Sequence, residues 1–354
     1  MLLARYDFTG ARPDRATLRD RAPTMWRYIE FLPPMPDSPV SLGEMMTPLL
    51  RLPALERAFG VRTLWLKDEG RLPTGTFKAR GMAVAVTMAK QLGAQALAAP
   101  SAGNAGAALA AYARRAGLPA TVFFPPDVPP ITIAEARAAG AEIRDCASLP
   151  DGGAKTREGA AAGKWFGLST LLEPYRAEGK KTMGLELAEQ LDWRLPEVII
   201  YPTGGGTGLI GLWKAFEELR VAGWVSDAPP RMVAVQPVGC APLVQALEAG
   251  ASECGPVERP DTIAPGLRVP RSAGDFYLLR ILRESKGTAV AVTDDDIRAA
   301  ARELAASEGL LVCPEGAATL AALRALRANG WVRPDDRVVL LNTGTGLKHP
   351  ELFA

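Results

Sequence analysis

Short apolar runs alternate with longer Ala-rich segments along most of the chain. The runs that predict strands are Thr63–Leu66, Ala96–Ala99, Thr121–Phe124, Trp165–Ser169, Val198–Tyr201, Met232–Gln236, Thr288–Val292 and Val338–Leu341. The segments that predict helices include Phe77–Leu92, Gly103–Ala116, Glu178–Leu191, Gly208–Val221, Asp294–Ser307 and Gly316–Ala328. Strands with little polar alternation, separated by helices, are typical of parallel sheets covered by helices on both faces. The pattern therefore predicts an α/β fold.

Glycine and proline indicate where units could connect. We interpret the Gly-rich stretch Asp151–Gly163 and the turn-rich stretch Pro125–Pro130 as connections. The first forty residues are rich in proline and predict an extended arm with one short helix near Met25–Phe31. A chain of 354 residues is longer than one hydrophobic core usually supports, so two lobes are expected.

The composition narrows the classes of function. The formal net charge is +2, from 41 basic and 39 acidic residues without a basic block, which gives no indication of a nucleic-acid or membrane partner. The first ten residues lack the pattern of a secretory signal, and no stretch is apolar enough to span a bilayer, so we expect a cytoplasmic protein. Cys146, Cys240, Cys254 and Cys313 form no C-x-x-C pair, and His349 is the only histidine. We therefore expect reduced thiols, no metal site and no histidine-based triad.

The segment Leu66–Gly81 places a lysine where a strand gives way to a helix. A polar turn follows the predicted strand, and Lys78 comes at the opening of the next helix. The N–H dipoles at a helix N-terminus repel positive charge and lower a lysine pKa, as a Schiff-base lysine requires. A lone lysine is more often a solvated surface residue. The neighbouring segments are therefore needed to distinguish a Schiff-base lysine from a surface lysine.

Other glycine-rich segments follow predicted strands. In Pro100–Gly106, small residues precede a helix whose start favours a carboxylate or phosphate, and Asn104 could either cap that helix or bind a cofactor ring. In Tyr201–Gly211, three consecutive glycines and two hydroxyls form an anion cradle before a helix. Leu340–Lys348 lies at the carboxyl end of the last strand, where ligands of α/β proteins bind.

The cradle also matches a dinucleotide fingerprint, in the register Gly206-x-Gly208-x-x-Gly211. However, the next predicted strand ends in Val235-Gln236, without the acidic residue that would hold a ribose. No Gly-Lys-Ser/Thr ending indicates a P-loop. A single phosphate is the better match.

Taken together, these segments resemble the fold-type II pyridoxal-phosphate enzymes, which are tryptophan synthase β-like, and within them the threonine synthase family. The motifs that carry the resemblance occur in the family's order from Thr47 to Lys348: Pro-Thr-Gly-Thr-Phe-Lys, Ser-Ala-Gly-Asn-Ala-Gly, the triglycine loop and Thr-Gly-x-Gly-Leu-Lys. In addition, Glu178–Thr182 reads Glu-Gly-Lys-Lys-Thr and is similar to the family's Glu-Gly-Gln-Lys-Thr. The resemblance implies a homodimer of two-lobed chains, each lobe with a largely parallel sheet flanked by helices. The large lobe would comprise 1–87, with the arm 1–45, and 178–354, and the small lobe 88–177 would close over the cofactor.

The resemblance also implies roles for individual residues. Lys78 would form the Schiff base with pyridoxal 5′-phosphate and later shuttle protons, next to Phe77. Asn104 would contact the cofactor's 3′-oxygen, and Thr343 would hydrogen-bond the pyridine nitrogen, where a neutral hydroxyl suits elimination or replacement at the β-carbon. The phosphate would be held by Gly204, Gly205, Gly206 and Thr207. The substrate would be contacted by Thr76, Ser101, Ala102, Gly103, Ala105 and Arg176.

Some positions depart from the family's motifs. Ala79 stands in place of an acid, Thr345 in place of a histidine, and Glu173 where the family often has asparagine. A negative charge at Glu173 would disfavour a phosphorylated substrate there. The triglycine loop also resembles that of serine/threonine dehydratases.

Three hypotheses of function follow from these patterns. The first is threonine synthase, which converts O-phospho-L-homoserine and water to threonine and phosphate. The second is a serine/threonine dehydratase or diaminopropionate-type ammonia-lyase, with a β-replacing synthase as a variant. The third is a non-catalytic amino-acid-binding protein on the same scaffold, which would have no need of the Schiff-base lysine.

Overall fold

The chain forms two compact units, each built around its own sheet. The computed structural model describes residues 1–8 and 14–354. The first unit comprises Met1–Met46 and Leu72–Thr182, and the second comprises Thr47–Arg71 and Met183–Ala354, so that one boundary falls inside helix α6 (Tyr175–Gln190). These units group the N-terminal arm and the segment after Leu72 with the smaller sheet. The sequence predicted a division for closure over a cofactor, with a large lobe of 1–87 and 178–354 and a small lobe of 88–177. This division stays a prediction.

The second unit contains a six-stranded sheet in the order β1-β2-β10-β7-β8-β9. Its strands are β1 (Leu49–Arg51), β2 (Thr63–Asp68), β7 (Val198–Pro202), β8 (Arg231–Pro237), β9 (Thr288–Val292) and β10 (Arg337–Asn342). All neighbours pair in parallel except β1, which runs antiparallel to β2. Ile199 and Ile200 point to opposite faces of β7 and are both fully buried. Both faces of the sheet are therefore covered, as the apolar runs predicted.

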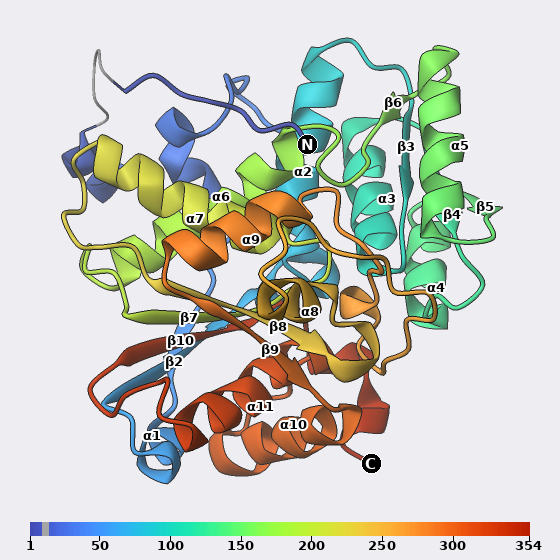
Figure 1. The fold of residues 1–354 in the computed structure, drawn as a ribbon. Helices are drawn as coiled ribbons and strands as arrows, with labels where there is room; N and C mark the ends of the chain where they lie inside the picture. The colour runs from blue at the N-terminus through green and yellow to red at the C-terminus, as the bar shows by residue number, and fades with distance from the viewer. Residues whose placement is uncertain (9–13) are drawn as a thin grey trace. The chain divides into compact units, whose positions relative to one another are not determined.

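Helices cover this sheet on its two faces. They are α1 (Pro53–Phe59), α7 (Thr207–Val221), α8 (Pro242–Glu248), α9 (Asp275–Glu284), α10 (Asp294–Glu308) and α11 (Pro314–Ala328). The side chains of α1, α10 and α11 form one core with alternate residues of β2, β7, β8 and β10 (Figure 1). The parallel arrangement places the carboxyl ends of β7 and β10, with the segments predicted to bind the cofactor, at the same edge of the sheet.

The first unit contains a four-stranded parallel sheet in the order β5-β4-β3-β6. The strands are β3 (Leu97–Pro100), β4 (Ala120–Phe124), β5 (Glu142–Asp145) and β6 (Phe166–Gly167), and the helices are α2 (Lys78–Gln91), α3 (Asn104–Ala116), α4 (Pro130–Ala138) and α5 (Leu149–Ala161). Helices α2 and α3 pack on one face through a core that includes Leu97, Val122 and Phe124. Helix α5 covers the other face, beside Phe123 (Figure 1).

The interpretation of Asp151–Gly163 as a connection was wrong, because helix α5 spans most of this stretch. Ser148 caps the helix by accepting a hydrogen bond from the N–H of Asp151. In the N-terminal arm, the predicted short helix is present as a 3-10 helix over Met25–Phe31, and a second one spans Arg15–Asp20. Residues 9–13 of the predicted arm lie outside the described residues. No helix that the structure describes has the length and apolar character needed to cross a membrane.

Candidate active site

Lys78 is the first residue of α2, as its sequence context predicted. The N-cap residue is Phe77, whose own side chain makes no capping hydrogen bond. Thr76 is buried and its hydroxyl accepts a hydrogen bond from the backbone N–H of Lys78 at 3.4 Å. The half-buried Lys78 side chain places its amine 4.5 Å from the centroid of the Phe77 ring. The amine thus lies at the positive end of a helix and beside an aromatic face.

The loop before α3 is shaped by Ser101. Its buried hydroxyl accepts hydrogen bonds from the N–H groups of Gly103 at 3.0 Å and Gly106 at 2.8 Å. Gly103 is the N-cap of α3, with φ of 144° and no side-chain cap, and Asn104 is the first residue of the helix. The alternative in which Asn104 caps this helix is therefore wrong, because Ser101 bonds the first-turn N–H of Gly106. Ala102 and Ala105 are half-buried residues of the same turn.

The start of α6 holds a buried group of charged residues. The carboxylate of Glu173 accepts a hydrogen bond from the backbone N–H of Arg176 at 3.0 Å, as a helix cap does. The Arg176 guanidinium donates to the carbonyl oxygen of Leu168 at 2.8 Å. Neither Nε of Arg176 nor Oε1 of Glu173 has a hydrogen-bond partner among the described residues. Burial raises the pKa of Glu173, although the positive charge of Arg176 acts in the opposite direction. Burial therefore disfavours the negative charge of the carboxylate that stands here in place of the family's asparagine.

The triglycine loop joins β7 to α7 and leaves no room for side chains. A Cβ atom added at Gly204 would lie 2.3 Å from the carbonyl oxygen of Gly266, and one at Gly206 would lie 2.3 Å from Leu278 Cδ1. Ser272 donates to the carbonyl oxygen of Gly205 at 2.9 Å. The N-cap of α7 is Gly206, with φ of 76° and no side-chain cap, and Thr207 begins the helix. Backbone donors at an uncapped helix N-terminus fit a phosphate.

Thr343 follows β10 and is buried. Its hydroxyl oxygen lies 3.7 Å from the Sγ of Cys313, and burial raises the pKa of that thiol well above its ordinary value. The thiol donates to the side-chain oxygen of Asn342, whose amide nitrogen in turn donates to Asp68 at 2.8 Å. The thiol therefore stays protonated beside Thr343. A neutral hydroxyl facing the pyridine nitrogen is compatible with these surroundings.

The other departures have local explanations. Ala79 is fully buried in the apolar core of the first unit, where a carboxylate would lose its contact with water. Thr345 caps the 3-10 helix Gly346–Lys348 by accepting from the N–H of Leu347. The four cysteines are free and buried. Across the described ranges, no group of three or more metal-ligating side chains is present.

Several residues that support the predicted site were not predicted from the sequence. Glu315 accepts a hydrogen bond from the N–H of Gly266 at 2.7 Å and so holds the segment against which Gly204 packs. Ser272 and Lys180 were also missed. Ser272 lies in a loop without a motif, and Lys180 was read only as part of a motif. The three consecutive glycines indicate that another segment of the backbone approaches this loop closely. The sequence does not show which segment that is.

Residues 40–344 match the family model described as pyridoxal-phosphate dependent enzyme. Threonine synthase from Methanosarcina acetivorans is 37% identical over 98% of this chain and 85% of the relative. Threonine synthase from Methanocaldococcus jannaschii is 37% identical over 94% of this chain and 83% of the relative. The chain belongs to the threonine synthase family of pyridoxal-phosphate-dependent enzymes.

Among solved structures, threonine deaminase from T.th. has a TM-score of 0.72 and 28% identity, covering 94% of this chain and 98% of that chain. The predictions of an α/β fold-type II enzyme and of pyridoxal phosphate as cofactor are thereby confirmed. The interpretation as a non-catalytic member of this scaffold is not supported. The roles of individual residues stay predictions.

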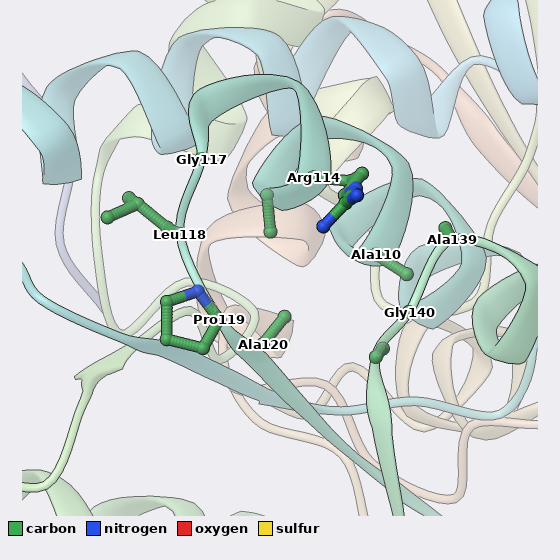
Figure 2. A pocket seen from close by; sticks show the side chains of 10 residues that line it. Ala110, Arg114, Gly117, Leu118, Pro119, Ala120, Ala139 and Gly140 are labelled. Atoms are coloured by element: carbon green, nitrogen blue, oxygen red, sulfur yellow. The ribbon is translucent and has the colours of Figure 1, made fainter.

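A pocket in the first unit lies apart from the predicted residues. It is lined by the C-terminal end of α3, including Arg114, by Leu118–Ala120 and by Ala139–Ala141 (Figure 2). Asn104 and the loop before it are at the opposite end of α3. Arg114 is the single charged residue of this lining, and the others are small or apolar. The pocket therefore offers a ligand few charged or polar side chains to bind.

Gly208 provides a test of how tightly the start of α7 is packed. A Cβ atom at this position would lie 1.7 Å from the hydroxyl oxygen of Tyr201. We expect Gly208→Ala to lower the free energy of unfolding by about 1–3 kcal/mol through overpacking, measured by urea denaturation. Gly153→Ala is the matched control, because that helical glycine has its nearest neighbour at 3.5 Å. Equal stabilities of the two variants would contradict the packing described for α7.

Proposed function

We propose that this enzyme is a threonine synthase, which converts O-phospho-L-homoserine and water to L-threonine and phosphate. The observation that carries the proposal is the 37% identity to threonine synthase from Methanosarcina acetivorans over 98% of the chain. In the reaction the bond between the γ-carbon and the phosphate oxygen breaks, and water adds its oxygen at the β-carbon. Bound pyridoxal phosphate supplies the electron withdrawal that makes the α-proton acidic.

Lys78 is assigned the covalent attachment of the cofactor and, after the substrate amine has taken its place, the transfer of protons among the α-, β- and γ-carbons. Its position at a helix N-terminus supports this role, because helix dipoles disfavour the charged amine. Gly204, Gly205, Gly206 and Thr207 are assigned the cofactor phosphate. The close packing of Gly204 and Gly206 supports this, since no side chain there stands between the backbone donors and an anion. Asn104 and Thr343 are assigned the cofactor's 3′-oxygen and pyridine nitrogen.

Arg176 and the loop Ser101–Ala105 are assigned the anionic groups of the substrate, with Thr76 as a further contact. Arg176 is a buried guanidinium whose Nε has no acceptor among the residues that the structure describes. A buried cation with an unused donor is a strong site for an anion. The N-terminal end of α3 likewise lacks a side-chain cap at Gly103, and a helix N-terminus favours a carboxylate.

A second candidate is a dehydratase or ammonia-lyase that releases a keto acid. The likeness to threonine deaminase from T.th., at 28% identity, favours it. So does Glu173, because a carboxyl group beside the predicted substrate arginine is unfavourable for a phosphorylated substrate. A β-replacing synthase would use the same residues with a different second substrate.

Product analysis distinguishes these candidates. We expect purified holoenzyme, incubated separately with phosphohomoserine, serine, threonine and diaminopropionate, to release equal amounts of threonine and phosphate from phosphohomoserine. Mass spectrometry and a phosphate assay measure these products. Keto acid and ammonia from serine, threonine or diaminopropionate, without threonine from phosphohomoserine, would overturn the proposal in favour of the second candidate.

The proposal extends to the setting of the enzyme. We propose that the enzyme is cytoplasmic and forms a homodimer. The proposal is based on the resemblance to the family and on a composition without a charge bias. Light scattering of the purified holoenzyme measures the mass. A monomeric mass at micromolar concentration would contradict the dimer without affecting the assigned chemistry.

A further inference from the structure

The segment between β6 and α6 holds buried polar atoms without a hydrogen-bond partner. They are the hydroxyl oxygen of Ser169, Oε1 of Glu173 and Nε of Arg176, and none of them is hydrogen-bonded to a residue that the structure describes. Each of the three residues is more than nine-tenths buried. Buried polar groups are almost always hydrogen-bonded, so the concentration of such atoms within 169–176 indicates that a further group binds here.

Glu173 and Arg176 are held together at the start of α6. The backbone N–H of Arg176 donates to Oε2 of Glu173 at 3.0 Å. The outer part of the guanidinium is occupied, because its Nη1 donates to the carbonyl oxygen of Leu168 at 2.8 Å. Nε is the guanidinium nitrogen nearest to the backbone. An anion bound at Nε therefore stands at the backbone end of the arginine side chain, which is the end that the Glu173 carboxyl group contacts.

The charged groups that act on Glu173 lie on α6. Burial raises the pKa of Glu173, whereas the positive charges of Arg176 and Lys180 lower it. The amine of Lys180 is itself fully buried, and burial and then the charges of Arg176 and Lys78 hold its pKa well below the ordinary value. Lys180 therefore contributes little positive charge. Arg176 is the permanent cation beside the carboxyl group.

One arginine does not balance both a carboxylate and a doubly charged phosphate in a buried site. A phosphate monoester has a second pKa of about 6, so it carries nearly two negative charges at neutral pH. Like charges that share a buried site do not all stay ionised. A proton held between a carboxyl oxygen and a phosphate oxygen removes the repulsion and forms a strong, charge-assisted hydrogen bond. Oε1 of Glu173 is an unpartnered oxygen that can hold this proton.

We propose that Glu173 makes the enzyme bind its phosphorylated substrate together with one proton, which the carboxyl group and a phosphate oxygen share in the complex. The proposal rests on the proposed function, in which Arg176 binds an anionic group of phosphohomoserine. The proton comes from the solvent when the phosphate is a dianion, and with the substrate when it is a monoanion. Nε of Arg176 donates to the same phosphate. Glu173 is thus a specificity-determining residue, whereas an asparagine, which the family often has at this position, donates a hydrogen bond without taking up a proton.

Calorimetric titration of the holoenzyme measures this proton. The probe is the phosphonate analogue of phosphohomoserine, in which a methylene group replaces the bridging oxygen so that no phosphate can leave. Binding heats at about pH 9, in two buffers of different ionisation enthalpy, give the number of protons taken up, because both anionic groups are then ionised before binding. Glu173→Gln is the test variant. Its carboxamide oxygen can still accept from the N–H of Arg176 and cap α6, and its amide nitrogen can donate to the phosphonate.

Two further variants accompany the test. Glu158→Gln is the matched control, because it removes the same charge from an exposed position on α5. Glu173→Asn carries the residue of the family's motif and should behave as Glu173→Gln does. We expect wild type and Glu158→Gln to take up about one proton more for each bound phosphonate than either Glu173 variant. The dissociation constant of wild type, relative to that of Glu173→Gln, should accordingly rise about tenfold per pH unit in this range.

Equal proton uptake by wild type and the two Glu173 variants would overturn the proposal. Failure of wild type and all variants to bind the phosphonate, while serine or threonine is still converted to keto acid, would instead overturn the proposed function and this proposal with it.

Discussion

Lys78→Ala is expected to lower turnover by at least about a thousandfold and to abolish the visible absorption of the lysine-bound cofactor. The variant loses both the covalent attachment and the group assigned to proton transfer. Steady-state assay with phosphohomoserine and the absorption spectrum of protein incubated with excess pyridoxal phosphate measure the two effects. The fold should be unaffected, because the side chain that is truncated is only half-buried.

Lys90→Ala is the control for Lys78→Ala, since it removes a lysine from the other end of the same helix. Lys90 is exposed and donates to the carbonyl oxygen of Ala116 at 3.0 Å. This control should retain the absorption band and most of the activity. A Lys78→Ala protein that keeps a lysine-bound cofactor would show that another amine carries it.

Gly204→Ala is expected to weaken the binding of pyridoxal phosphate by about 100-fold. The added Cβ atom would lie 2.3 Å from the carbonyl oxygen of Gly266 and 3.1 Å from Val269, so the loop must move. Displacing one backbone donor from a phosphate costs about 1.5–3 kcal/mol for a charge-assisted hydrogen bond, and the upper part of this range corresponds to a loss of affinity of about 100-fold. Equilibrium dialysis of apoenzyme against the cofactor measures the dissociation constant.

Gly167→Ala serves as the matched control for Gly204→Ala. Gly167 lies in β6, and a Cβ atom there would have its nearest neighbour at 3.4 Å, an ordinary contact. Its affinity for the cofactor should remain close to that of wild type. An unchanged dissociation constant in Gly204→Ala would show that the triglycine loop does not hold the phosphate.

The strands could be predicted because parallel strands buried on both faces appear in the sequence as continuous apolar runs. Every predicted run corresponds to a strand, with ends shifted by a few residues. The strands that were missed are β1 and β5, each at an edge of its sheet. β5 (Glu142–Asp145) is short, charged and mostly exposed, so no apolar run marks it. Pairing with β4 creates this strand, and tertiary contacts are not visible in a local pattern.

Helix α5 was missed because its glycines suggested a connection. A Cβ atom at Gly159 would lie 2.1 Å from the ring of Trp165, and one at Gly152 would lie 3.0 Å from the Sγ of Cys146. The glycines therefore let the helix pack closely on the sheet and on Trp165, at a cost in helix propensity. Sequence alone cannot distinguish a glycine that permits packing from one that ends an element.

Some residues of the candidate site could likewise be predicted from the sequence, whereas others depend on the fold. Lys78, the triglycine loop and Thr343 follow strands or open helices as predicted, because strand-to-helix transitions can be read locally. Lys180 could not be recognised, since its partner in space, the ring of Phe77, is distant in sequence. The capping of α6 by Glu173 likewise depends on the fold.

Borohydride reduction of the holoenzyme, followed by proteolysis and mass spectrometry, tests most directly the claim that Lys78 carries the cofactor. We predict that the reduced phosphopyridoxyl adduct will be found on the peptide that contains Lys78, in an amount equal to the enzyme. An adduct on Lys180 or on any other lysine, or the absence of an adduct from active enzyme, would contradict the account.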